Sequence, residues 1–477
     1  MDMKNALKFY INGEWVNPTT PRTLSVINPA TEQSMGEISL GSSADVDLAV
    51  AAAKEAFKSF SQTTREERIA YLEKILALYK SRWADISLAI SDEMGAPMAL
   101  AQGSQAGAGY AHFNSALEAL KTYEFESKLG NSQILHEPIG VCGLITPWNW
   151  PMNQIAHKVG PAIACGCTMI LKPSEIAPFD AIIMAEIIDE AGLPAGVFNL
   201  INGDGPTVGE AMSAHKDIDM MSFTGSTRAG TAVARASAAT VKRVAQELGG
   251  KSPNIILDDA NMEQAITVSV MTMMNNTGQS CNAPSRMLVP ASKLDEIKEI
   301  AVRVAESIVV GDPKDSATTM GPVISELQWD KIQGLINKGI EEGCEVITGG
   351  PGKPEGLETG YYIKPTIFSG VTNDKTIAVE EIFGPVFAIM TYDSEDEAIE
   401  IANDTDYGLS AYISSTNIGH ANAVARHLRA GNVHINGQWG TEPTPFGGYK
   451  QSGNGREGGV FGFEDFLEIK AVMGYYE

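Results

Sequence analysis

The chain has 477 residues, of which 44% are hydrophobic and 20% charged, a composition typical of a folded protein with two or three domains. A formal net charge of −24 argues against a nucleic-acid partner, because acidic surfaces repel phosphate backbones. No apolar run approaches the roughly 18 to 20 residues that cross a membrane, and the first residues lack the apolar stretch of a signal peptide. We therefore expect a soluble cytoplasmic protein without a membrane partner.

The five cysteines predict neither disulfides nor a metal site. They include no CxxC pair and do not cluster with the seven histidines. Cys165 and Cys167 flank a glycine where a helix is expected to end before an apolar strand. Thiols in such a place are usually buried and behave as small hydrophobic groups, so we interpret this pair as structural.

The first half of the chain predicts strands followed by helices and then an alternation of the two. The first 40 residues read as short strands, with Asn12–Gly13 as a hairpin signal. Ser43 is predicted to cap a helix, and a second long helical pattern covers residues 65–91. From Gly140 short apolar strands alternate with helices, one of them opened by Pro178. This order is typical of βαβ units on a parallel sheet.

The second half repeats this pattern and ends in an apolar tail. A strand and a helix from about 261 follow Gly249, and the alternation continues to about 440, which predicts a second α/β domain. Residues 120–139 are polar and irregular and are predicted to bridge domains or subunits. The tail from 466 is apolar and β-prone, so it fits either an intersubunit strand or the last strand of an internal sheet.

Two short motifs are not taken as phosphate-binding loops. Residues 453–458 fit GxGxxG, but no clear strand precedes them and too few residues follow for a βαβ unit. Residues 250–252 look like the end of a P-loop, yet the glycine required five residues earlier is Ala245. Neither motif therefore predicts a nucleotide site.

Three segments carry residue types suited to covalent catalysis. Cys281 lies in GQSCN among small polar residues, where a thiol can ionise and attack an electrophilic carbon. Glu247 ends a predicted strand before two glycines, so its carboxylate could activate water as a general base. Asn149, between Trp148 and Trp150, could donate to an oxyanion. The alternatives are a structural thiol, a surface or helix-capping charge, and an Asx-turn.

These segments, from INGEWV and NPAT to PFGGYKQSGNGRE, resemble the NAD(P)-dependent aldehyde dehydrogenase superfamily over nearly the whole chain. The resemblance implies an α/β fold with a Rossmann-like NAD-binding domain, a second α/β catalytic domain and a small β oligomerisation segment. The implied bounds are 1–119 and 140–249 for NAD binding, 250–450 for catalysis, and 120–139 with 451–477 for oligomerisation. Since relatives form dimers or tetramers, a homodimer or homotetramer is expected.

The resemblance also implies a hydride-transfer cycle through a thioester. Cys281 would attack the aldehyde to give a thiohemiacetal, whose oxyanion is held by the Asn149 side chain and the backbone N–H of Cys281. Hydride would pass to nicotinamide, and Glu247 would activate the water that releases a carboxylic acid. Lys158 matches a family lysine near the proton path. The presence of Glu247 argues against relatives that pass the acyl group to coenzyme A.

The implied cofactor is NAD, with NADP possible. Lys172 and Glu175 match residues that bind the adenosine ribose, and a carboxylate there would repel a 2′-phosphate, although Ser174 could soften this preference. The loop GDGPTVG has one residue too many for GxGxxG, consistent with the family's variant, and FTGSTRAG opens a helix whose N–H groups favour phosphate. The implied cofactor residues are Ile145, Thr146, Pro147, Trp148, Lys172, Ser174, Glu175, Gly205, Gly209, Phe223, Thr224, Gly225, Ser226, Leu248, Gly249, Glu381 and Phe383.

The implied substrate pocket is lined by Asn153, Gln154, His157 and Trp439. Several relatives that act on simple apolar aldehydes have tryptophan where this chain has His157, so this more polar mouth argues against long fatty aldehydes. Trp439 and Trp150 could also form an aromatic wall for a cationic or ring-bearing substrate, although tryptophan is more often a packing residue. Arg286 is interpreted as a structural ion-pair partner.

Two other function classes fit part of this residue pattern. A cysteine hydrolase could use the same thiol, oxyanion donor and base without net redox, but the cofactor motifs would then have no purpose. A catalytically idle binding protein on the same fold is disfavoured because Cys281, Glu247 and Asn149 occur together.

Overall fold

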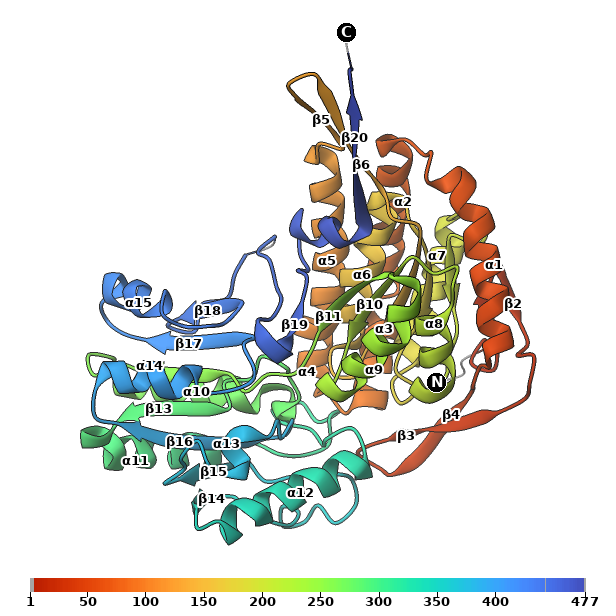
Figure 1. Cartoon of the computed structure of the whole chain (residues 1–477). Coiled ribbons are helices and arrows are strands. Elements are labelled where there is room, and N and C mark those ends of the chain that lie inside the picture. Colours follow the sequence, from red (N-terminus) through yellow and green to blue (C-terminus); the bar gives the residue numbers. More distant parts are fainter. Residues whose placement is uncertain (1–3, 442, 476–477) are drawn as a thin grey trace.

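The computed structural model describes residues 4–441 and 443–475. The chain forms two lobes, each built around a large sheet, and a three-stranded sheet projects above the first lobe (Figure 1). This arrangement confirms the predicted α/β fold. No helix in the described part of the chain combines the length and apolar character needed to span a bilayer.

The first lobe contains an eight-stranded sheet in the order β19-β11-β10-β7-β8-β9-β1-β2. Its five central strands run parallel, as the strand–helix alternation predicted. The strands are β1 (Phe9–Ile11), β2 (Glu14–Val16), β7 (Val141–Ile145), β8 (Thr168–Lys172), β9 (Phe198–Leu200), β10 (Met220–Thr224), β11 (Arg243–Glu247) and β19 (Gly453–Asn454). The helices are α1 (Ser43–Phe60), α2 (Arg65–Ser81), α3 (Trp83–Met94), α4 (Met98–Leu100), α5 (Ala106–Thr122), α6 (Pro151–Cys165), α7 (Phe179–Ala191), α8 (Glu210–Ala214) and α9 (Thr227–Ser237).

Several local predictions for this lobe can be compared with the structure. Asn12 and Gly13 have positive φ values of 55° and 79° and join β1 to β2, which confirms the hairpin. The cap of α1 is Ser42 rather than Ser43, because the Asp45 carboxylate accepts from the backbone N–H of Ser42 at 2.8 Å. The single helix expected over residues 65–91 is wrong, since α2 ends before Arg82 and α3 begins after it.

The second lobe contains a seven-stranded sheet in the order β14-β15-β16-β13-β12-β17-β18. All neighbouring strands are parallel except β14 and β15. The strands are β12 (Pro253–Ile256), β13 (Arg286–Pro290), β14 (Glu345–Thr348), β15 (Thr366–Ser369), β16 (Val386–Tyr392), β17 (Ser410–Ser414) and β18 (Asn432–Ile435). The helices are α10 (Met262–Met274), α11 (Leu294–Glu306), α12 (Glu326–Glu341), α13 (Thr376–Val379), α14 (Glu395–Asn403) and α15 (Ile418–Ala425). The second α/β region predicted after Gly249 is therefore present.

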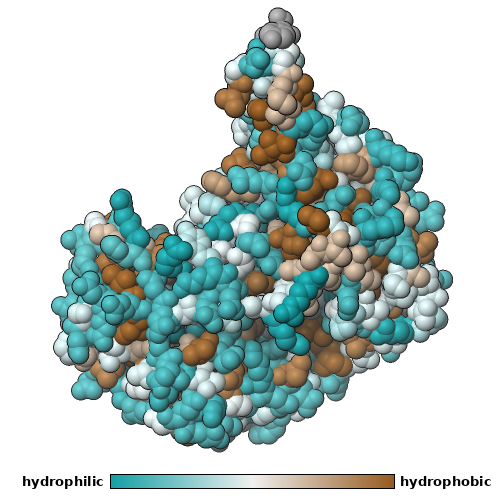
Figure 2. Space-filling view, in the orientation of Figure 1, coloured by the Kyte–Doolittle hydropathy of each residue, from teal (hydrophilic) through white to brown (hydrophobic). Residues whose placement is uncertain are grey.

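The projecting sheet has the order β20-β6-β5, with bounds Leu467–Met473, Ser132–Pro138 and Glu126–Leu129. Residues 120–139 are therefore not irregular, because β6 pairs with β5 on one side and with the tail strand β20 on the other. Figure 2 shows apolar surface along this projection. Its most exposed apolar side chains are Leu129, Ile469 and Met473, at 72%, 70% and 80% exposure.

The hairpin of β3 (Thr23–Asn28) and β4 (Gln33–Ser39) connects the lobes. At its tip, the Glu32 carboxylate accepts from the backbone N–H of Gly360 at 2.8 Å, and Pro29 accepts from Tyr361 at 2.9 Å. The first lobe is thus tied to the second by a segment distant in sequence (Figure 1).

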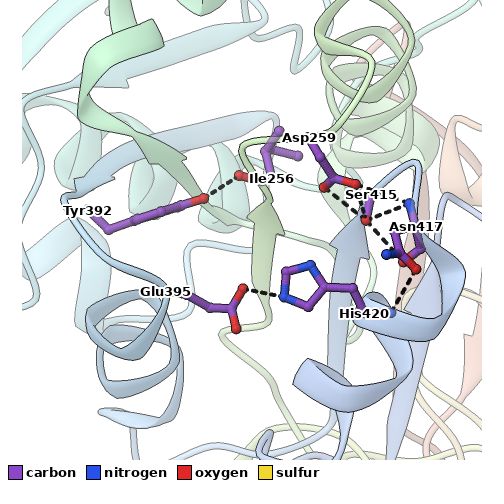
Figure 3. A network of polar contacts seen from close by, with 7 residues as sticks. All are labelled: Ile256, Asp259, Tyr392, Glu395, Ser415, Asn417 and His420. Carbon is purple, nitrogen blue, oxygen red and sulfur yellow. Dashed lines mark hydrogen bonds and ion pairs between the residues drawn. The ribbon is translucent and has the colours of Figure 1, made fainter.

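A network of hydrogen bonds joins two loops at the carboxyl end of the second sheet (Figure 3). Asp259, which follows β12, accepts hydrogen bonds from Ser415 at 2.8 Å, from the Thr416 hydroxyl at 2.9 Å and from the Asn417 backbone at 3.1 Å. Asn417 in turn caps α15 by accepting from His420 N–H. These bonds hold the loops after β12 and β17 together, because each oxygen of the Asp259 carboxylate has a partner.

Candidate active site

The loop between α10 and β13 positions Cys281 through an uncommon backbone conformation. Asn276, Thr277 and Gly278 have successive φ values of 53°, 57° and 69°, which side chains rarely adopt. A Cβ on Gly278 would lie 2.2 Å from the carbonyl oxygen of Gly384, so only glycine fits there. The loop therefore turns sharply toward the first lobe immediately before Cys281.

Asn149 is fixed against this loop. It is buried at the start of α6, and its Nδ2 donates to the carbonyl of Gln279 at 3.0 Å. The backbone carbonyl of Asn149 accepts from Asn276 Nδ2 at 2.9 Å and from Gln105 Nε2 at 3.0 Å. An amide nitrogen has two hydrogens, so one remains for a second acceptor near Cys281.

Cys281 lies half-buried on the wall of a cavity of about 450 Å³. Burial, with the Glu381 and Glu247 carboxylates, raises the pKa of its thiol. A Cβ on Gly250 would lie 2.4 Å from the carbonyl oxygen of Cys281, so the glycines after Glu247 let the two segments approach closely. The other lining residues include Trp150 and the four expected pocket residues Asn153, Gln154, His157 and Trp439.

Glu247 ends β11 and is 4% exposed. Burial and the nearby charge of Glu457 raise its pKa well above the usual range, whereas Lys158 acts in the opposite direction. Among the described residues neither oxygen of Glu247 has a hydrogen-bond partner. A buried carboxylate without partners binds a proton strongly, which is the property expected of a base that takes one from water.

Lys158 and Glu457 form a buried ion pair beside Glu247. Lys158 Nζ contacts Glu457 Oε1 at 2.7 Å and donates to the Ser222 hydroxyl at 2.9 Å. Burial alone would raise the pKa of Glu457, but Lys158 and His157 outweigh this effect and hold the pKa well below its usual range. Sequence reasoning missed Glu457, which lies inside the segment 453–458 that was set aside as a nucleotide motif.

The carboxyl edge of the first sheet gathers the residues expected to bind the adenosine half of the cofactor. Lys172 Nζ contacts Glu175 Oε2 at 3.2 Å just after β8. A Cβ on Gly209 would lie 3.7 Å from Ile145 and 4.0 Å from Lys172, so the loop GDGPTVG reaches this site. Its residues Gly205–Gly209 form one π-helical turn, which accounts for the extra residue relative to GxGxxG.

The remaining expected cofactor residues lie at or just after the ends of β7, β8, β10 and β11. Ser226 caps α9 by accepting from Ala229 N–H, and Gly225 donates to the carbonyl of Glu247 at 3.0 Å. Ser174, Phe223 and Leu248 are buried, whereas Pro147 is half-buried. Within the described residues the hydroxyls of Thr146 and Thr224 are buried without hydrogen-bond partners. Buried hydroxyls left open at a sheet edge fit a polar ligand such as a dinucleotide.

Glu381 and Phe383 approach this edge from the second lobe. The Glu381 carboxylate accepts from the backbone N–H of Gly250 at 2.9 Å, and a Cβ on Gly249 would lie 2.5 Å from it. The ring of Phe383 meets that of Trp148 edge-on at 5.3 Å between centroids. Residues from both lobes are thus brought together between the adenosine region and Cys281.

The expectation for Arg286 needs correction. Its guanidinium is fully buried and donates to the carbonyls of Lys251, Ile401 and Ala402 and to the Asn373 amide oxygen, rather than to a carboxylate of the described chain. Sequence reasoning also missed Gln105, Asn276 and His112, which reach the site from other elements. No local pattern marks them, because their partners are distant in sequence.

Comparisons with known proteins agree with this geometry. The model of the aldehyde dehydrogenase family matches residues 15–472. A 3-succinoylsemialdehyde-pyridine dehydrogenase from Pseudomonas sp. is 58% identical over 99% of both chains. A crystal structure of aldehyde dehydrogenase C from Pseudomonas syringae, a cysteine-to-alanine variant with NAD+ and octanal, is 50% identical with a TM-score of 0.99, covering 100% of this chain and 98% of that one.

A more distant structure has the same fold. Betaine aldehyde dehydrogenase from Staphylococcus aureus, in complex with NAD+, is 35% identical with a TM-score of 0.94 and covers 98% of this chain and 97% of that one. Together with the family match over nearly all residues, these likenesses show that the chain belongs to the aldehyde dehydrogenase family.

Proposed function

We propose that this chain oxidises an aldehyde to a carboxylic acid with reduction of NAD, through a thioester on Cys281. The observation that carries this proposal is that Asn149 and the segment after Glu247 both approach the loop that carries Cys281. Cys281 lines the cavity, the Asn149 amide is fixed against its loop, and Glu247 is buried without a partner nearby. Homologues of known structure in complex with NAD+ support the cofactor.

In the first step the Cys281 thiol releases its proton to water in the open cavity, the sulfur bonds to the aldehyde carbon, and the negative charge moves to the aldehyde oxygen. The remaining Asn149 N–H and the backbone N–H of Cys281 are the donors for this oxyanion. Because Asn149 is already held by Gln279 and Asn276, it needs little reorganisation to donate. When bound, NAD would supply a hydride acceptor for this adduct, and Glu381 and Phe383 would hold its nicotinamide end.

In the second step water hydrolyses the thioester. Glu247 takes a proton from the water, the water oxygen bonds to the acyl carbon, and the carbon–sulfur bond breaks to return the thiolate. The raised pKa of Glu247 suits it to take this proton. Lys158 and Glu457 adjoin Glu247, and we assign them to the path by which the proton then leaves.

The residues at the sheet edges fit a dinucleotide. We assign Lys172 and Glu175 to the adenosine ribose, Ser226 at the start of α9 to phosphate with Gly225 shaping the turn before it, and Glu381 to the nicotinamide ribose. The Glu175 side chain is 32% exposed and would face a 2′-phosphate with like charge. We therefore propose NAD in preference to NADP, the buried Ser174 being too short to offset this charge.

The cavity wall supports a ring-bearing aldehyde as the substrate class. Tyr412 and His434 stack at 4.7 Å between centroids, and Trp439 lies 4.8 Å from His434, so flat rings line one side. The pyridine-containing name of the relative at 58% identity agrees with such a wall. The relative at 50% identity was crystallised with octanal, a fatty aldehyde. Comparing an eight-carbon aldehyde with ring-bearing aldehydes therefore tests whether this chain disfavours long aliphatic substrates.

We also propose a cytoplasmic homodimer or homotetramer. The five cysteines are free thiols, as expected in a reducing compartment. The exposed apolar side chains on the sheet β20-β6-β5 favour a subunit contact. We keep the proposed NAD-binding (1–119, 140–249), catalytic (250–450) and oligomerisation (120–139, 451–477) parts, noting that β19 joins the first sheet.

The direct experiment follows reduction of NAD and of NADP with aromatic, pyridine-bearing, short aliphatic and eight-carbon aldehydes. The proposal expects NAD reduction, fastest with ring-bearing aldehydes, together with release of the matching acid. Absence of reduction with every aldehyde and either cofactor would contradict it. Ester hydrolysis that proceeds without any cofactor-dependent oxidation would favour the hydrolase instead.

A further inference from the structure

His157 faces the substrate cavity and at the same time contacts the buried ion pair behind it. Its Nδ1 lies 3.2 Å from Oε2 of Glu457, and both side chains are about one-tenth exposed. The other oxygen of Glu457 is taken by Lys158. Consecutive helical residues normally diverge by about 100°, so Glu457 lies between the directions of His157 and Lys158 on α6.

The orientation of His157 is set by a second histidine. Its ring stacks on that of His112 from α5, with 3.5 Å between centroids. Asn153 Oδ1 accepts from Gln154 Nε2 at 3.2 Å, which turns Asn153 Nδ2 toward His112 Nε2 at 3.1 Å. Since an amide nitrogen only donates, His112 accepts this bond at Nε2.

Glu247 adjoins the same ion pair of Lys158 and Glu457. A cavity of about 10 Å³, close to the size needed for one water molecule, is lined by Glu247, Lys158 and Glu457. Other charged groups that face it are Arg456 and Asp465. Across this small cavity the negative charge of Glu457 disfavours ionisation of Glu247, whereas the positive charge of Lys158 favours it.

We propose that His157 is a positioning residue for thioester hydrolysis, because its contact with Glu457 weakens the negative field that this carboxylate exerts on Glu247. The inference rests on the proposed function, in which Glu247 is the base. The His157 ring sets a polar nitrogen 3.2 Å from Oε2 of Glu457, whereas phenylalanine would place only apolar carbon against this buried oxygen. Less Glu247 would then be ionised at neutral pH, and hydrolysis would slow.

The test measures decay of the Cys281 acyl-enzyme as a function of pH. The full-length enzyme is acylated with p-nitrophenyl acetate, and its decay after the burst is followed by rapid quench. His157→Phe is expected to move the midpoint of the profile about 1 pH unit toward alkaline, which makes decay roughly tenfold slower at neutral pH. His157→Gln, which keeps an N–H donor, is expected to restore most of the profile.

Glu457→Gln supplies a test of opposite sign. Removing the negative charge should move the midpoint toward acid, and His157→Phe should then cause no further shift, because the two effects share one carboxylate. Trp439→Phe changes the same cavity wall without touching Glu457 and is expected to alter KM but not the decay profile.

The outcomes distinguish failure of the proposed role of His157 from failure of the proposed aldehyde dehydrogenase activity. An unchanged profile in His157→Phe, a glutamine variant that behaves like phenylalanine, or additive shifts in the double variant would overturn the role of His157. A wild-type enzyme that shows no burst with the ester and no oxidation of aldehydes would instead contradict the proposed function.

Discussion

Strand β12 separates two polar clusters that differ in how completely their hydrogen bonds are made. Beyond its carboxyl end, Asp259 has partners on Ser415, Thr416 and Asn417 (Figure 3). Before its amino end, Glu247 has no partner among the described residues. The first cluster holds loops together, whereas the second keeps acceptors free for reactants at some expense of stability. Substitutions should therefore affect stability at one end and catalysis at the other.

The largest expected effect is that of Cys281→Ala. Loss of the nucleophile should lower aldehyde oxidation by about 10⁴-fold or more, because Cys281 is the only thiol among the described residues that line the cavity. Thermal unfolding should change little, since the thiol is only half-buried. The measurement is cofactor reduction beside a melting curve. Full activity in the variant would exclude the covalent mechanism.

Glu247→Gln should slow thioester hydrolysis by roughly 10²- to 10⁴-fold while leaving the rate of acylation of Cys281 unchanged. A burst of reduced cofactor of about one per site should therefore appear before slow turnover. The raised pKa also has a stability consequence, because the folded protein retains a proton that the unfolded chain releases above about 4.5. The contribution of Glu247 to stability thus falls as pH rises from 4.5 through the folded pKa, and the glutamine variant should lack this fall. Equal pH dependence of unfolding in both proteins would contradict this reasoning.

Asn149→Ala should lower kcat by roughly 10²- to 10³-fold through loss of an oxyanion donor. Unlike Glu247, Asn149 is also tied to Gln279, so some stability should be lost with activity. Asn149→Asp makes a useful contrast, because it keeps the size but places negative charge near the oxyanion. Steady-state kinetics of both variants would test this, and an alanine variant with normal kcat would remove Asn149 from the mechanism.

The smallest effect belongs to Asp259→Asn at the far end of β12. Burial acts against ionisation of Asp259, but hydrogen bonds from Ser415 and its neighbours outweigh it and lower the pKa. Its stabilising contribution is therefore present at neutral pH and is lost as pH falls below about 4. Because the site is exposed, we expect a loss of only about 0.5 to 1 kcal/mol, with kcat unchanged. Denaturant unfolding measures the change in stability, and the aldehyde assay measures kcat. A strong loss of activity would contradict the assignment of Asp259 to stability alone.

The fold was largely predictable because its signals are local. Apolar strands alternating with helices from Gly140 predicted the parallel sheets, and Asn12–Gly13 predicted the hairpin. The break at Arg82 was missed because helical periodicity continues across it. Strands β5 and β6 were missed because β5 is exposed along its length and β6 is half-exposed throughout, so neither has an alternation of buried and exposed positions. The pairing of β6 with β5 and with β20 leaves no pattern in the local sequence.

The site was predictable only where a residue sits in a distinctive segment. Cys281, Glu247 and Asn149 stand beside glycines or tryptophans that mark special backbone, and the family resemblance then gave them roles. Glu457 and His112 could not be found in this way, because their importance comes from contacts made across 299 and 41 residues. Such long-range contacts depend on packing of whole helices.

The left-handed run Asn276–Gly278 has a practical consequence for protein engineering. Its close approach to Gly384 links the nucleophile's backbone to the segment that carries Phe383, so neither segment can be redesigned alone. Libraries that seek new aldehyde scope should leave both segments intact and vary exposed wall positions such as Trp439. A variant selected in that way can change the shape of the cavity while the reacting sulfur stays in its original place.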